Sequence, residues 1–185
     1  MSTLTLRPNA AQLTGQTRSA GTNNYECIDE ATLDESDYCY CSGSSSSQTS
    51  MDLYGFPDHS TESETINSVT VKAYAKKIIK GTDANNVTIR MAINIGGTRY
   101  FGSANNLTTS TALYSHTYSV NPATSSAWSW TNVDNLLVGD ELTSHYIDKN
   151  NNISSYVYQL WVEVDYGAAT GPVMPVFLYH YMNHC

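Results

Sequence analysis

The residues of this sequence best suited to bind a metal ion are its cysteines and two histidines near the end of the chain. Cys39 and Cys41 alternate within a strand-like segment, so their thiols are expected to face the same side. Cys27 precedes them across an acidic loop. Thiolate and imidazole groups are ligands that zinc prefers. One prediction is therefore a structural zinc site drawn from Cys27, Cys39, Cys41, His180 and His184.

The same cysteines fit two simpler interpretations, which are favoured because Cys-x-Cys is less specific for zinc than Cys-x-x-Cys. In the first, Cys27 forms a disulfide with Cys39 or Cys41. Cys39 and Cys41 do not easily bridge each other, because alternate strand residues lie near the upper limit of about 7 Å between Cα atoms. In the second, all four cysteines, Cys185 included, are free thiols. The sequence leaves these possibilities open.

An acidic segment between residues 28 and 37 carries the oxygen ligands that calcium prefers. It lacks the ligand spacing of an EF-hand, so a solvated loop is favoured over a calcium site. We therefore predict no cofactor, with structural calcium or zinc as the alternatives. The carboxylates concerned are Asp29, Glu30, Asp34, Glu35 and Asp37.

No catalytic residues are predicted. Glu163 and Asp165 alternate along one predicted strand and could serve as the carboxylate pair of a glycoside hydrolase. Solvated carboxylates on the outside of a sheet are the more ordinary interpretation, and it is favoured. The sequence contains no Gly-x-Ser-x-Gly, P-loop, Gly-x-Gly-x-x-Gly or His-Glu-x-x-His motif. The chain is therefore expected not to be an enzyme.

The tryptophans could bind a sugar, because aromatic rings stack on the faces of pyranose rings. The candidates are Trp128, Trp130 and Trp161. Trp128 and Trp130 lie beside the one helix-like pattern of the chain, where aromatic residues often seal the end of a sandwich. Since large aromatic side chains are usually buried, a position in the core or at its end is favoured over a ligand platform.

The composition excludes two classes of partner. The chain has 185 residues, with Lys+Arg 9 against Asp+Glu 17 and a net charge of −8. Nucleic-acid binding requires clustered basic residues, so it is not expected. No apolar stretch approaches the ~18 residues of a membrane span, and the N-terminal residues do not resemble a signal peptide. Ser, Thr and Asn supply about a third of the chain, while a hydrophobic fraction of 41% is sufficient for a packed core.

Short strands must position these side chains, because apolar and polar residues alternate along most of the chain. Residues 65–80 alternate in this way. Residues 87–95 alternate more strongly and end at Gly96-Gly97, which predicts a tight hairpin. The other expected elements are strands at 36–41, 111–120, 141–147 and 156–166, a short helix or turn cap at 126–136, and loops at 9–24, 28–37 and 42–50.

This pattern predicts an all-β protein: an antiparallel, jelly-roll-like β-sandwich formed by residues 1–166, with the Ser-rich segment 42–50 as an internal loop. Residues 167–172 are expected to form a linker, and 173–185 an apolar tail strand. An apolar terminal strand must be buried, either on its own domain or on the sheet edge of a neighbour. The tail residues predicted to contact another subunit are Val176, Phe177, Leu178, Tyr179 and Tyr181.

The order of several segments resembles a family of β-sandwich proteins encoded among the structural genes of tailed phages and prophages. The similarity covers residues 4–166 and includes Asn24-Tyr-Glu-Cys-Ile-Asp-Glu30, the Gly96-Gly97 hairpin and Gln159-Leu-Trp-Val-Glu-Val-Asp-Tyr166. The resemblance implies a virion protein, such as a head decoration, tail or fibre-associated protein, assembled in the host cytoplasm. Its partners would be copies of itself and other virion proteins. The chain departs from the family at Cys27, Cys39 and Cys41, where small or apolar residues are common.

Two other functions stay open at this point. One is a carbohydrate-binding or receptor-binding module that recognises a glycan of the host surface, which requires tryptophan side chains exposed on a sheet face. The other is a subunit of an extracellular filament, in which Cys185 or the tail would link neighbouring subunits.

Overall fold

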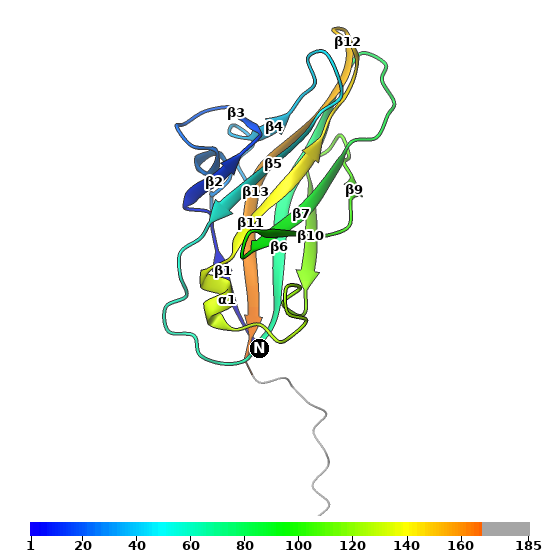
Figure 1. Ribbon diagram of the computed structural model, residues 1–185. Coiled ribbons are helices and arrows are strands. Elements are labelled where there is room, and N and C mark those ends of the chain that lie inside the picture. The colour runs from blue at the N-terminus through cyan, green and yellow to red at the C-terminus, as the bar shows by residue number, and fades with distance from the viewer. Residues whose placement is uncertain (168–185) are drawn as a thin grey trace, which may run out of the picture.

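The protein, described over residues 1–167 by a computed structural model, is a sandwich of two antiparallel sheets (Figure 1). Sheet A contains β10 (Ala112–Tyr118), β6 (Ile66–Lys80), β13 (Asn151–Tyr166), β4 (Cys39–Cys41) and β3 (Thr17–Arg18) in spatial order, with β1 (Ser2–Leu6) and β12 (His145–Asp148) also paired to β13. Sheet B contains β2 (Ala10–Thr14), β5 (Thr49–Gly55), β11 (Leu137–Thr143), β7 (Thr88–Ile95) and β8 (Thr98–Phe101), with β9 (Asn105–Asn106) paired to β7. The antiparallel β-sandwich predicted from the alternation is confirmed.

The longest ladder of the structure joins β6 and β13 in sheet A. Val71 pairs with Val162, and both side chains are buried between the sheets. The intervening residues therefore face the outside of sheet A. The register shifts between Val157 and Gln159, where β13 carries a bulge.

The hairpin predicted at Gly96-Gly97 joins β7 to β8. Both glycines have positive φ, 58° and 88°, which is the backbone geometry that a two-residue turn of this kind requires. The turn pairs Ile95 with Thr98 and so sets the register of this edge of sheet B.

The strand predicted at 141–147 is wrong as a single element, because the chain changes sheets inside it. β11 ends at Thr143 in sheet B, and β12 begins at His145 in sheet A. Ser144 between them is buried, and its N–H donates a 2.8 Å hydrogen bond to the carbonyl of Gln48. Alternation continues through this crossing, so the sequence pattern did not reveal it.

The short helix or turn cap predicted at 126–136 is present as the short helix α1 (Trp130–Asp134), which begins after the N-cap residue Ser129. One other expectation needs correction. The expected loop at 9–24 contains β2, β3 and the start of a 3-10 helix, η1 (Asn24–Cys27). β2 and β3 are short and lie at sheet edges, where polar residues replace the usual alternation.

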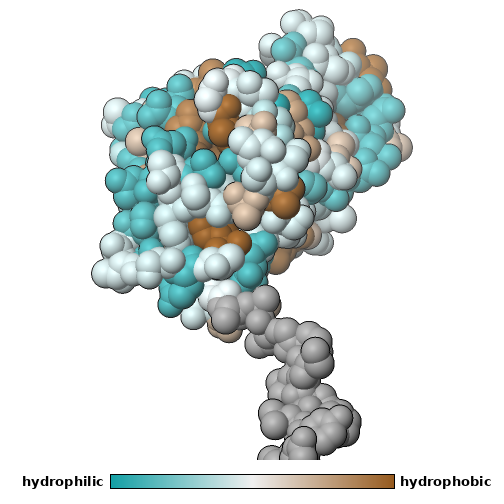
Figure 2. All heavy atoms as spheres, turned by 60° about the horizontal axis from the view of Figure 1, so that its bottom comes forward, coloured by the Kyte–Doolittle hydropathy of each residue, from teal (hydrophilic) through white to brown (hydrophobic). Residues whose placement is uncertain are grey.

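The surface has the neutral polar character expected from the composition. Figure 2, which brings the α1 end of the domain forward, shows hydrophilic and intermediate residues over most of this view. Hydrophobic residues appear there as separate small patches. Among residues 1–167, neither helix has the length and apolar character needed to span a membrane.

A polar network lies inside the sandwich, between the two sheets. Asp52 on β5 is fully buried and accepts four hydrogen bonds, one of them from the hydroxyl of Tyr54 at 2.7 Å and one from the side-chain amide of Asn24 at 2.6 Å. The backbone N–H groups of Gly15 and Gln16 donate the other two. These bonds satisfy the carboxylate and tie the segment before β3 to sheet B.

Asp140 on β11 lies beside Asp52 and is less well satisfied. The two residues are register partners in sheet B, and Asp140 is fully buried. Gln16 Nε2 donates a 2.7 Å hydrogen bond to Asp140 Oδ2, but Asp140 Oδ1 and Gln16 Oε1 have no partner among the described residues. Burial, together with the nearby charge of Asp52, raises the pKa of Asp140 to about 8. Protonation of Asp140 removes one of the two adjacent buried charges. It also gives the Asp140 carboxyl group, whose Oδ1 has no donor among the described residues, a proton to donate.

The stability of the protein is therefore expected to fall as the pH rises. Because the folded-state pKa of Asp140 is raised, its contribution is complete below the ordinary value of 3.8 and is lost as the pH rises to about 8. Asp140→Asn carries no charge and can still pair with Gln16, so its free energy of unfolding should change less between pH 5 and pH 8. Urea unfolding of both proteins across this range checks the expectation. Parallel pH profiles would contradict it.

The predicted tail lies outside the described residues. This applies to the subunit-contact residues Val176, Phe177, Leu178, Tyr179 and Tyr181, and to His180, His184 and Cys185. The tail-mediated contact between subunits therefore stays a prediction.

Candidate functional site

Six aromatic side chains gather on the outer face of sheet A, the side turned away from the core. Tyr40 on β4 and Tyr156 on β13 are register partners. The residues that follow them, Cys41 and Val157, are buried in the core, so alternation turns both tyrosines outward. We name this surface the aromatic face, and its rings are Tyr38, Tyr40, Tyr74, Tyr156, Tyr158 and Trp161.

Trp161 lies along sheet A and keeps part of its ring open to solvent. Its indole N–H donates a 2.9 Å hydrogen bond to Glu163 Oε1, two residues further along β13. The neighbouring ring of Tyr74 on β6 is tilted by 33° to the indole, with the two centroids 5.7 Å apart. Both aromatic residues are half-buried. The two rings therefore present an apolar surface to solvent, while their other sides pack against sheet A.

Charged groups border this aromatic pair. Lys72, the register partner of Trp161, places its Nζ 2.7 Å from Glu163 Oε2. Burial alone would raise the pKa of Glu163, but the hydrogen bonds from Lys72 and Trp161 outweigh it and lower that pKa. Glu163 is thus an ionised acceptor, and Lys72 a charged donor, at the rim of the Trp161 ring.

Four tyrosines form a second group on the aromatic face. The rings of Tyr40 and Tyr156 are stacked, with centroids 5.5 Å apart and planes inclined by 16°. Tyr38 meets Tyr156 and Tyr158 edge-on, at centroid distances of 5.1 and 5.7 Å. Burial raises the pKa of both Tyr156 and Tyr158. Their hydroxyl groups therefore remain protonated at neutral pH and can donate as well as accept hydrogen bonds.

Residues 31–37, which we name the acidic strap, cross part of the aromatic face. The chain enters the strap from the edge of β13, where the carbonyl of Ile28 accepts a backbone hydrogen bond. Further on, Glu35 forms an ion pair with Lys76 on β6. Lys76 Nζ also lies 4.7 Å from the centre of the Tyr158 ring, and Tyr158 is only 2% exposed. The strap is therefore fastened to sheet A.

The remaining carboxylates of the acidic run do not converge on one point. Asp34 Oδ1 accepts a 2.8 Å hydrogen bond from the N–H of Ser36, within its own turn. Burial raises the pKa of Asp29 and of Glu30. Within residues 1–167, no group of three or more His, Cys, Asp or Glu side chains is arranged to hold a metal ion. Residues 1–167 therefore form no calcium or zinc site among themselves, and the predicted zinc ligands His180 and His184 lie outside these residues.

Cys27, Cys39 and Cys41 are buried free thiols. The prediction that Cys39 and Cys41 face the same side is confirmed, since both lie in the core. Cys27 Sγ is 3.2 Å from the carbonyl of Ala20, and Cys39 Sγ is 3.3 Å from that of Asn24. The free-thiol interpretation therefore describes these three residues, and the disulfide between Cys27 and either partner is not formed.

These thiols are expected to resist modification in the folded protein. Burial raises the pKa of Cys39 well above its ordinary value, so little reactive thiolate is present. A thiol-specific reagent should modify Cys27, Cys39 and Cys41 only after denaturation. Peptide mass mapping of protein labelled with and without denaturant measures each site separately. Rapid labelling of Cys39 in the native protein would contradict the burial.

The other two tryptophans lie away from the aromatic face. Trp128 is 5% exposed, and its indole N–H donates a 2.9 Å hydrogen bond to the carbonyl of Tyr118. Its ring is buried, so the prediction that Trp128 stacks on a sugar is wrong. Trp130 on α1 stacks on His59 with centroids 4.9 Å apart. Its indole N–H donates to the carbonyl of Glu64 at 2.9 Å. Both side chains fit the interpretation of a sealed sandwich end.

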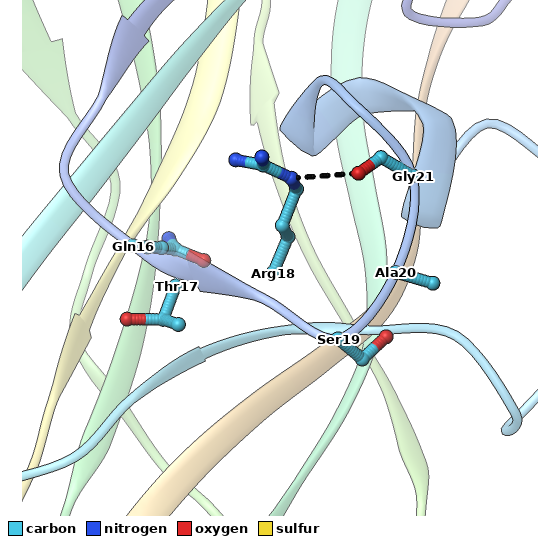
Figure 3. Close-up of a pocket in the computed structure, with 6 residues that line it drawn as sticks. All are labelled: Gln16, Thr17, Arg18, Ser19, Ala20 and Gly21. Carbon is cyan, nitrogen blue, oxygen red and sulfur yellow. Dashed lines mark hydrogen bonds between the residues drawn. The ribbon is translucent and has the colours of Figure 1, made fainter.

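Two polar hollows lie near β3 and β4. The first, of about 420 Å³, is lined by residues 16–21, and Arg18 Nε donates a 3.0 Å hydrogen bond to the carbonyl of Gly21 within it (Figure 3). The second, of about 380 Å³, includes Tyr40 and Cys41 in its lining. Ligand pockets are usually lined by apolar and aromatic groups, so these hollows are weaker candidates than the aromatic face.

No protein-family model matches the chain, and no curated protein matches it. Similar solved structures include TmCBM61 in complex with β-1,4-galactotriose, at 7% identity and a TM-score of 0.42, covering 70% of this chain and 71% of that chain. They also include the family 11 carbohydrate-binding module from Clostridium thermocellum in complex with a β-1,3-1,4-mixed-linked tetrasaccharide, at 13% identity and a TM-score of 0.38, covering 87% of this chain and 86% of that chain. At these identities no residue role is carried over from either structure.

Sequence reasoning found Trp161 but missed its surroundings. Tyr74, Lys72 and Tyr40 come from segments far apart in the chain, and only the pairing of β6, β13 and β4 brings them together. The outward parity of Tyr74 and Lys72 in the predicted strand 65–80 was a usable indication. Nothing in the sequence pattern indicated that the acidic strap would form an ion pair with Lys76.

Proposed function

We propose that the protein binds carbohydrate through the aromatic face. The observation that carries this proposal is the group formed by Trp161, Tyr74, Glu163 and Lys72, in which an apolar ring surface lies beside a charged acceptor and a charged donor. The group stands on the outer side of sheet A.

This group matches the two kinds of surface that a sugar ring presents. The C–H face of a pyranose is apolar and suits the rings of Trp161 and Tyr74, which are large hydrophobic surfaces with polar edges. The hydroxyl groups at the rim of the sugar both donate and accept hydrogen bonds. Glu163 accepts and Lys72 donates, and hydrogen bonds to charged groups are stronger than those between neutral groups.

The group is also ordered before any ligand arrives. Trp161 is held by its hydrogen bond to Glu163, and Glu163 by its ion pair with Lys72. All three side chains project from the long paired strands β6 and β13. Side chains that are already fixed lose less conformational entropy on binding, which favours affinity.

We propose binding without hydrolysis at this site. A glycoside hydrolase needs a carboxylic acid with a raised pKa to protonate the leaving oxygen. Glu163 has a lowered pKa instead, because Lys72 and Trp161 donate hydrogen bonds to its carboxylate. Its chemistry therefore suits an acceptor of hydrogen bonds better than a general acid.

The biological setting follows from the sequence resemblance and stays a proposal. A structural virion protein of a phage would use a carbohydrate-binding face to contact a glycan of the host surface. Assembly with copies of itself and with other virion proteins also stays a prediction, as does the alternative of an extracellular filament.

Trp161→Ala tests the proposed function. Removing the indole takes away most of the apolar surface of the group, so affinity for a bound polysaccharide should fall at least about tenfold, equivalent to about 1.4 kcal/mol. Affinity electrophoresis against a panel of polysaccharides measures the effect, and Trp161→Phe should retain part of the affinity.

Trp130→Ala is the matched control, because it removes the same residue type from α1, at the sealed end of the sandwich. Thermal unfolding of each variant shows whether a loss of binding reflects a loss of fold. If every polysaccharide that retards the native protein retards Trp161→Ala equally, the binding site does not include Trp161 and the proposed location is wrong.

A further inference from the structure

Both ammonium groups that border the rings of the aromatic face are already paired with carboxylates. Lys72 Nζ lies 2.7 Å from Glu163 Oε2. Lys76 forms its ion pair with Glu35 of the acidic strap and also lies over the ring of Tyr158. Hydrogen bonding to Lys76 is the largest cause that lowers the pKa of Glu35, so this carboxyl group is ionised at neutral pH. Neither lysine offers a free positive charge to an incoming anion.

The acidic strap adds negative charge beside these two pairs, although Arg7 donates hydrogen bonds to the carbonyls of Glu30 and Ala31 at its start. The strap carries Asp34 and Asp37 in addition to Glu35. The pKa of Asp34 is lowered by hydrogen bonds from Ser36, so Asp34 is also charged at neutral pH. The chain as a whole has a net charge of −8. Charges act over a screening length of about 8 Å at physiological ionic strength, so an anion that approaches near the strap is repelled.

The binding free energy of a neutral sugar at the aromatic face should therefore differ from that of an acidic sugar. A sugar hydroxyl can donate to Glu163 and accept from Lys72 while the ion pair between them stays intact. A carboxylate or sulfate that reaches Lys72 or Lys76 would lie beside Glu163 or Glu35, and the two like charges repel each other. The arrangement thus discriminates by charge.

We infer that the ligand of the aromatic face is an uncharged glycan, without uronic acid, sialic acid or sulfate groups. This inference rests on the proposed function and names the class of sugar that the site accepts. In the same arrangement, Glu35 and Glu163 determine specificity: each occupies a lysine that would otherwise attract an anionic polymer.

Affinity electrophoresis with the full chain tests the inference, using neutral hexose or pentose polymers and, in parallel, a polyuronate and a sulfated polysaccharide. We expect at least one neutral polymer to retard the native protein at low and at high salt, and the anionic polymers not to retard it. Retention by an anionic polymer alone would overturn the inference but leave carbohydrate binding in place. Retention by no polymer of either class would overturn the proposed function together with it.

A double variant, Glu35→Gln with Glu163→Gln, provides the second arm. Glutamine keeps a carbonyl oxygen for the indole N–H of Trp161 but frees both ammonium groups. The variant should gain retention by the polyuronate at low salt, by at least about fivefold, and lose this gain at high salt because the attraction is then screened. Its retention by the neutral polymer should fall rather than rise, because Glu163→Gln replaces a charged acceptor of the binding group with a neutral one.

The matched control is Glu62→Gln with Glu64→Gln, which changes the net charge equally on the loop before β6. It should gain no retention by the polyuronate. An equal gain in both double variants would show a general effect of net charge and would overturn the role of Glu35 and Glu163. Thermal unfolding verifies that each variant is folded, and absence of any gain in a folded Glu35→Gln, Glu163→Gln protein would equally overturn that role.

Discussion

The pairing of β6 with β13 is the interaction on which the rest of the structure depends. It is the longest ladder, and it runs from Ile66 and Tyr166 at one end to Lys80 and Asn152 at the other. One side of this ladder supplies buried aliphatic residues to the core, while the other side carries Tyr74 and Trp161. Because side chains alternate on each side of the bulge, a shift of one residue would bury the aromatic pair and expose the core. The fold and the candidate site therefore depend on the same register.

The one irregularity in the middle of this ladder has a structural consequence. The bulge at Tyr158 places Gln159 where its side-chain amide can donate to the carbonyl of Glu30. The backbone N–H of the next residue, Leu160, donates to the carbonyl of Ile28. These bonds hold the start of the acidic strap at the edge of β13. Its far end is held by the ion pair of Glu35 with Lys76, so one bulge and one ion pair fix a segment that has no regular secondary structure.

Charge is distributed differently inside and outside the sandwich. Inside, Asp52 receives four donors, whereas its neighbour Asp140 is relieved of its charge by a raised pKa. Outside, Lys72 and Glu163 keep their charges and neutralise each other beside Trp161. Both arrangements avoid an unpaired charge that is shielded from water, which is unfavourable by several kcal/mol when fully buried. The buried pair stabilises the segment before β3, and the partly buried pair of Lys72 and Glu163 contributes no net charge beside Trp161.

By itself, the sequence determined the fold class, the core positions of the long strands and the hairpin at Gly96-Gly97, because each of these follows from local alternation or local backbone geometry. It also marked Trp161 as a candidate but could not separate it from Trp128, since burial of an aromatic ring depends on which strands cover it. Only the tertiary structure decided that Tyr74, Lys72 and Tyr40 join Trp161 on one face, that the strap lies on Lys76, and that Asp52 and Asp140 are neighbours. These are contacts between residues far apart in the chain, and strand order and register, which create them, are not encoded in the periodicity of any single strand.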